Sequence, residues 1–197
     1  MAINAARALV KPARTALLIC DLQDKFSTAI HEFNSIVQNS IRLMNALNIL
    51  KVPMLVTEHN PKSLGKTVPE LDISSAMLFS KTSFSMFTPE VENAISTICN
   101  GSKPESIILL GIEAHVCVEN TAIDLRRHGF EVHNVADCMS SRTQENRLLA
   151  LQRMQQMGCQ TTTVENILFK LMGDCTHKEF KNVLNIIKTP SIPTGLV

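Results

Sequence analysis

The chain has 197 residues, of which 45% are hydrophobic and 19% charged, and its net charge is +1. These values are typical of one globular domain that is large enough to bury a core. The near-neutral charge argues against a nucleic-acid-binding protein, and no apolar run approaches the roughly 20 residues of a membrane-spanning helix. Six cysteines without a CxxC pair indicate reduced thiols, so we expect an intracellular, cytoplasmic protein.

The first 15 residues carry Arg7, Lys11 and Arg14 and no acidic residue. Such a segment is compatible with a short mitochondrial presequence, which leaves a mitochondrial location open. A plain leader to the first strand is the favoured interpretation.

Short apolar runs alternate with helical patterns along the chain. We expect strands at 15–20, 54–57, 77–80, 106–111, 131–136 and 159–164. We expect helices at 34–50, with Asn34 as its cap, and at 89–99, 116–128, 143–157, 165–172 and 177–188, followed by a loose tail after residue 190. This alternation predicts an α/β protein with a parallel sheet and helices on both of its faces.

The stretch from Ile107 to Ala122 joins a buried strand, a turn at Gly111 and the start of a helix. Cys117 therefore follows the carboxyl end of a strand, where open α/β sheets bind ligands and where a helix N-terminus favours an anion. Asp21 and Lys81 end two other strands. Because the carboxyl ends of parallel strands share one edge, these three residues can converge.

The three side chains also fit together chemically. A thiol attacks as the thiolate, a carboxylate can take its proton, and an ammonium group stabilises the charged pair. The amide of Cys117 and one from the turn at 111–113 could form an oxyanion hole. Spacing alone leaves other roles open, namely a core position for Cys117, a turn cap for Asp21 and a solvated side chain for Lys81.

Three segments occur in an order that resembles the isochorismatase-like cysteine hydrolase superfamily, which includes nicotinamidases. They are Leu18–Phe26, Phe79–Ser85 and Gly111–Val118. The sequence of residues 113–117 is most similar to that of the eukaryotic isochorismatase-domain-containing proteins. The resemblance implies a three-layer α/β/α domain at 13–175, with a C-terminal helix and tail at 176–197. It further implies a catalytic triad of Asp21, Lys81 and Cys117, a cis peptide bond at Ile112–Glu113, and a homo-oligomer, either a dimer or a tetramer.

The sequence departs from some members of this superfamily. Where nicotinamidases carry an Asp-x-His metal motif, this chain reads Thr57-Glu58-His59-Asn60-Pro61, so we expect no metal, no cofactor and a substrate other than nicotinamide. Bacterial isochorismatases generally lack the cysteine, so Cys117 argues against that activity as well.

Four side chains near the motifs are expected to line the substrate pocket: Phe26, His59, Phe84 and His115. Core packing for the phenylalanines, a surface position for His59 and loop bracing for His115 are the alternatives.

The expected function is cysteine-dependent hydrolysis of a small amide or related acyl compound through a thioester, with no nucleic-acid or membrane partner. Two alternatives stay open. One is a non-catalytic interaction protein that retains the fold. The other is a redox-reactive thiol protein, in which Cys20 or Cys138 lies near Cys117 at the sheet edge.

Overall fold

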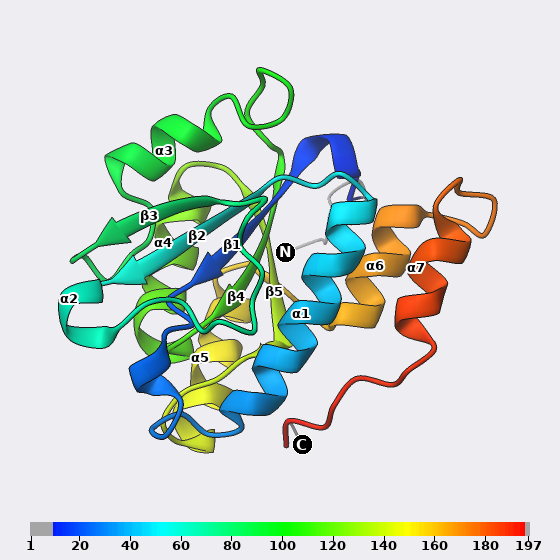
Figure 1. Ribbon diagram of the computed structural model, residues 1–197. Helices are drawn as coiled ribbons and strands as arrows, with labels where there is room; N and C mark the ends of the chain where they lie inside the picture. Colours follow the sequence, from blue (N-terminus) through cyan, green and yellow to red (C-terminus); the bar gives the residue numbers. More distant parts are fainter. Residues whose placement is uncertain (1–9, 196–197) are drawn as a thin grey trace.

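The computed structural model describes residues 10–195 (Figure 1). Six strands in this range form one sheet in the order β3-β2-β1-β4-β5-β6, and every neighbouring pair is parallel. The strands are β1 (Thr15–Cys20), β2 (Met54–His59), β3 (Met77–Lys81), β4 (Ser106–Gly111), β5 (Glu131–Met139) and β6 (Gln160–Thr162). The predicted α/β/α fold is therefore confirmed.

Helices cover both faces of the sheet (Figure 1). One face carries α1 (Phe33–Ile49), α6 (Val164–Met172) and α7 (Phe180–Ile187), and the other carries α3 (Pro89–Ile95), α4 (Glu119–Arg127) and α5 (Gln144–Gln156). The short helix α2 (Pro61–Leu64) follows β2, and a π-helical turn, Ala114–Val118, precedes α4. Single 3-10 turns lie at Pro12–Arg14 and Asp24–Phe26.

The central strands are buried on both faces, which explains their uninterrupted apolar sequences. All residues of β1 and β4 are buried. Along β1, Leu17 and Ile19 pack toward α1, whereas Leu18 and Cys20 pack toward the α3–α5 layer. The last residue of β1, Cys20, lies level with Thr57 of β2 and Gly111 of β4, so the carboxyl ends of these strands are aligned.

Helix starts follow local capping chemistry. Thr88, Thr143 and Thr163 accept hydrogen bonds from the first turns of α3, α5 and α6. The prediction that Asn34 caps α1 is wrong. The helix begins at Phe33, because Glu32 occupies the N-cap position with a φ of 53° and places Asn34 inside the first turn.

Other boundaries also differ from the prediction. Helix α3 ends at Ile95 instead of residue 99, and residues 96–98 form turns before the left-handed Asn100 and Gly101. Strand β5 continues to Met139, and β6 is only three residues long. The loop expected after residue 61 begins with the single-turn helix α2.

The C-terminal segment packs on the same body. Val183 and Ile187 of α7 are buried in the core on the α1 face. Residues 191–195, expected to be loose, make hydrogen bonds to Asn39 and to Arg147. The division of the chain at residue 175 stays a prediction.

No helix among residues 10–195 is long and apolar enough to cross a membrane. Most of the proposed N-terminal leader, including Arg7, lies outside the described residues, and the cellular compartment stays a prediction.

Candidate active site

Asp21 directly follows β1 and is almost completely buried. Its φ of 53° is left-handed, a conformation that aspartate tolerates better than most residues. Thr57 Oγ1 of β2 donates a hydrogen bond to Asp21 Oδ1 at 2.8 Å, and Lys81 Nζ lies 2.6 Å from Oδ2. Both carboxylate oxygens thus have partners, one on β2 and one on β3, which fixes the orientation of the group.

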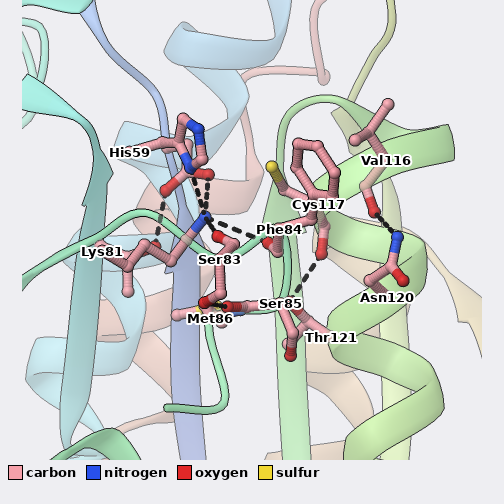
Figure 2. Close-up of polar contacts among 12 residues, drawn as sticks. His59, Lys81, Ser83, Phe84, Ser85, Met86, Val116, Cys117, Asn120 and Thr121 are labelled. Carbon is pink, nitrogen blue, oxygen red and sulfur yellow. Dashed lines mark hydrogen bonds and ion pairs between the residues drawn. The ribbon is translucent and has the colours of Figure 1, made fainter.

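Lys81 ends β3 and reaches Asp21 across β2, as the sheet order requires. Its Nζ also donates to the carbonyl oxygens of Ser83 and Phe84, each at 3.1 Å, and lies 3.4 Å from His59 Nδ1 (Figure 2). Burial by itself lowers the pKa of Lys81, but the negative charges available nearby, Asp21 among them, raise it above its ordinary value. Lys81 therefore stays cationic at neutral pH.

Cys117 lies in the π-helical turn, and its sulfur points toward Lys81 and His59 (Figure 2). The Sγ atoms of Cys117 and Cys20 and a carboxylate oxygen of Asp21 all lie within 4.8 Å of one another. Thr121 Oγ1 donates to the Cys117 carbonyl at 2.6 Å and accepts from the Met86 amide at 2.9 Å. Thr121 thereby ties the turn that holds Cys117 to the loop after Lys81.

The turn between β4 and Cys117 accepts only glycine at its first position. Gly111 has a φ of 122°, and a Cβ atom there would lie 2.0 Å from the carbonyl oxygen of Cys20. The following peptide bond, Ile112–Glu113, is cis.

The Glu113 carboxylate is bound by Arg142, which donates from its backbone amide at 3.0 Å and from Nη2 at 2.9 Å. Burial alone would raise the pKa of Glu113, but the hydrogen bonds and charge of Arg142 lower it below its ordinary value. Glu113 is therefore ionised and already paired at neutral pH.

The four expected pocket residues lie in three different settings. The rings of His59 and Phe84 stack with centroids 6.0 Å apart beside Lys81, and Phe84 is 58% exposed. His115 is in the same turn as Cys117, with Nδ1 2.9 Å from Ser141 Oγ. Phe26 is half-buried and packs against the core on the α1 face. Contact of all four with substrate stays a prediction.

A cavity of about 640 Å³ borders Lys81 and Ser83 and extends over Lys62 and Glu90. Neither Asp21 nor Cys117 is among its lining residues. We therefore do not identify this cavity with the reaction site.

The segment that aligns with the nicotinamidase metal motif has other partners here. Glu58 accepts hydrogen bonds from the amide and the hydroxyl of Thr67, at 2.7 and 3.0 Å. Among residues 10–195, Cys20, Asp21 and Cys117 are the one group with three potential metal ligands close together. The Lys81 ammonium group already pairs with that carboxylate, and its charge opposes a second cation.

Several site residues were missed by the sequence analysis, namely Thr57, Arg142, Ser141 and Thr121. Thr57 could have been found from the sequence, because it was expected to end the strand that follows β1 in the chain, and it pairs with Cys20 in the structure. Arg142 lies 29 residues from Glu113, and no local pattern links the two.

A parallel sheet between two helical layers, with Asp21, Lys81 and Cys117 grouped at its carboxyl edge, is the architecture of an isochorismatase-like hydrolase fold. The family model described as Isochorismatase domain matches residues 15–166. The chain belongs to this family, as the sequence motifs indicate.

Individual relatives agree. Isochorismatase domain-containing protein 1 of Salmo salar is 44% identical over 187 residues, which cover 94% of this chain and 65% of that protein. The structure of MAR1 ribonuclease from Caenorhabditis elegans superimposes with a TM-score of 0.90 at 42% identity, covering 96% of this chain and 97% of that chain.

The YcaC gene product of Escherichia coli, described as an octameric hydrolase of unknown specificity, shares the fold at 20% identity. Its TM-score is 0.77, with 91% of this chain and 96% of that chain covered.

Proposed function

We propose that the protein is a cysteine-dependent hydrolase that cleaves the C–N bond of a small amide or a related acyl compound. The observation that carries the proposal is the buried Asp21–Lys81 ion pair, 2.6 Å long, with the Cys117 sulfur within 4.8 Å of the same carboxylate. A carboxylate held next to a thiol can act as its general base.

The reaction follows from the roles of these groups. Asp21 takes the proton of Cys117, and the thiolate attacks the carbonyl carbon of the substrate. The backbone amides of Glu113 and Cys117 stabilise the oxyanion. Asp21 returns the proton to the leaving nitrogen, and water then hydrolyses the thioester. Lys81 holds the Asp21 carboxylate in place through their ion pair, and no metal or cofactor takes part.

The charges around the site support an uncharged substrate. Lys81 is neutralised by Asp21, and the nearby Arg142 is paired with Glu113. The stacked rings of His59 and Phe84 provide a flat surface beside Lys81. These features suit a small planar carbonyl compound better than an anion.

The ribonuclease name of the C. elegans structure suggests a second candidate substrate, RNA. An RNA substrate brings phosphates that need unpaired cationic partners. Lys81 is paired with Asp21, and Arg142 is paired with Glu113. Neither cation is free for a phosphate, which favours an amide substrate over RNA, and a direct assay can decide between the two substrates.

The first test is alkylation by acrylamide, a small amide that adds to thiolates. We expect the added mass on Cys117, and a rate at least tenfold lower in Asp21→Asn, because general-base assistance typically contributes about 10²–10⁴-fold. Asp72→Asn, at an exposed position, serves as the matched control. The mechanism is wrong if Cys117 stays unmodified or if Asp21→Asn reacts as fast as the unmodified protein.

The second test is a screen of primary amides, esters and RNA with the full chain and with Cys117→Ala. Amide hydrolysis that disappears in Cys117→Ala supports the proposal. Hydrolysis of RNA alone, lost in the same variant, would show that Cys117 takes part in cleaving phosphodiesters and not amides. No turnover of any substrate would favour the non-catalytic interaction protein.

We also propose that the protein self-associates. Exposed apolar side chains occur on α5, at Leu148 and Leu149, on α6, at Phe169, and on the edge strand β3, at Met77 and Leu78. Leu148 and Leu149 are consecutive, as are Met77 and Leu78, so each pair offers a local apolar contact for association. The octameric state named for YcaC supports the idea, and light scattering of the purified chain would measure it.

A further inference from the structure

A second thiol lies beside the proposed nucleophile and has no part in the hydrolytic reaction. Cys20 is the last residue of β1, directly before Asp21, and its Sγ is within 4.8 Å of Cys117 Sγ. Both cysteines belong to the core on the α3–α5 side of the sheet. The two thiols therefore lie on the same side of the sheet, with no helix or strand between them.

No other cysteine among the described residues joins this group. Cys138 lies in the core on the opposite face of the sheet, together with α1. Cys99 directs its Sγ toward the carbonyl oxygen of Thr15, at the opposite end of β1, and Cys175 is exposed. Cys159 shares the core on the α3–α5 side, but it directly precedes β6, whose first residue Gln160 pairs with His133 near the start of β5, so it lies toward the opposite edge of the sheet. All six cysteines lie within residues 10–195 and are free thiols in this structure.

We propose that Cys20 and Cys117 form a reversible disulfide when a hydroperoxide oxidises Cys117, and that this bond switches the site off. The effect on hydrolysis rests on the proposed function, whereas the bond itself depends only on the two thiols. A disulfide needs an S–S distance of about 2.0 Å, so rotation about the Cα–Cβ bonds has to bring the sulfurs together.

The two steps balance. Asp21 takes the proton of Cys117, and the thiolate attacks one peroxide oxygen. Cys117 becomes a sulfenic acid, and the other oxygen receives the proton from Asp21 and leaves as water or an alcohol. The Cys20 sulfur then attacks the Cys117 sulfur, Asp21 takes the proton of Cys20, and the hydroxyl group of the sulfenic acid leaves as water with that proton. Two thiols are oxidised to one disulfide, and one peroxide is reduced.

The environments of the thiols assign the two roles. Cys117 is 8% exposed, whereas Cys20 is completely buried. Burial, a hydrogen bond with Cys117 and the charge of Asp21 raise the pKa of the Cys20 thiol well above its ordinary value. Cys20 is therefore a neutral thiol that peroxide does not reach, and it acts only after Cys117 has been oxidised. Closing the disulfide protects Cys117 from further, irreversible oxidation.

The test treats the full chain with hydrogen peroxide in the presence of a metal chelator, blocks the remaining thiols, and maps the unreduced peptides by mass spectrometry. We expect one disulfide, between Cys20 and Cys117, with the loss of two hydrogens. We also expect acrylamide labelling of Cys117 to disappear and to return after dithiothreitol.

Two variants complete the experiment. In Cys20→Ala we expect no disulfide, accumulation of sulfinic acid on Cys117, and no recovery with dithiothreitol. Cys138→Ala also removes a completely buried cysteine from a strand, but on the other face, and should behave as the unmodified protein.

Sulfinic acid on Cys117 without a disulfide in the unmodified chain would overturn the proposal. Equal recovery of Cys20→Ala after reduction would do the same. If Cys20→Ala does not fold, the peptide map of the unmodified chain still shows whether the Cys20–Cys117 disulfide forms. Because this measurement detects the bond itself, it tests the proposal even if no amide proves to be a substrate.

Discussion

Asp21 is the residue that connects the backbone of the site with its chemistry. Its left-handed backbone turns the chain at the end of β1, and its carboxylate binds both Thr57 and Lys81. Asparagine tolerates the same backbone conformation but carries no charge. Loss of alkylation in Asp21→Asn would therefore report the missing base and not a misfolded turn.

The buried side chain of His133 in β5 leads to a prediction about how stability depends on pH. The side chain is completely buried, and neither ring nitrogen has a hydrogen-bond partner. Burial, with a smaller contribution from the charge of Lys170 on α6, lowers the pKa of His133 to about 4. Below pH 6.5 the unfolded chain binds a proton that the folded chain does not, so stability falls as the pH drops from 6.5 toward 4.

His133→Leu removes this effect. We expect the free energy of unfolding to fall less between pH 8 and pH 5 than in the unmodified protein, by up to about 2 kcal/mol at pH 5. Urea unfolding at several pH values measures the difference. Parallel pH profiles for the two proteins would contradict the prediction.

At the scale of elements, the loop between β5 and α5 supports the turn before Cys117. The Ala114 amide donates to the Ser140 carbonyl at 2.8 Å, His115 contacts Ser141, and Glu113 binds Arg142. Three successive residues of the turn thus each contact one of three successive residues of the loop. The loop positions the backbone that the proposed mechanism uses as an oxyanion hole.

Arg142→Ala tests this positioning role. We expect kcat for the amide substrate to fall about tenfold with little change in KM, because a shifted donor weakens transition-state stabilisation more than substrate binding. Arg153→Ala removes a similar paired arginine, bound to Glu119 on the surface, and should leave kcat unchanged. Equal losses in both variants, or a rise in KM alone, would argue against the positioning role.

The boundaries of an element can be predicted from the sequence where a single local feature determines them. Apolar runs locate β1 and β4 to the residue, because strands buried on both faces admit few polar side chains. The start of α1 was misplaced because the left-handed Glu32 is not a residue type that signals an N-cap, and the end of α3 because the turns at 96–98 come before the Asn100-Gly101 stop signal.

The proposed triad shows the same limit. Its three residues could be named because each follows a strand, and parallel strands align their carboxyl ends. The partners of the triad were harder to find. Arg142 reaches Glu113 through a loop, and which thiol lies near Cys117 depends on the face toward which β1 directs Cys20.

At the scale of the whole molecule, the C-terminal segment completes the packing around a buried charge. The Arg147 side chain is completely buried and donates to the carbonyl and hydroxyl oxygens of Thr194, at 2.5 and 2.9 Å. A truncation after residue 188 removes both acceptors. We expect it to lower the free energy of unfolding by about 2–3 kcal/mol, measured by urea unfolding, because hydrogen bonds to a buried charge are lost.

A double-mutant cycle isolates this contact. In Arg147→Met the charge is absent, so the truncation should cost less than it does in the unmodified chain. Identical costs in both backgrounds would show that the segment stabilises the protein elsewhere, for example through Asn39.

The sheet order has a consequence for how the site comes into being. Strand β1 pairs with β4, and the contact brings together residues as distant in sequence as Thr15 and Ser106. Asp21, Lys81 and Cys117 therefore meet only after these long-range pairings have formed, and such pairings close slowly because long loops must first be ordered. During synthesis the thiol thus remains without its carboxylate and ammonium partners until the middle of the sheet has assembled, and its reactivity is a property that the chain acquires late in folding.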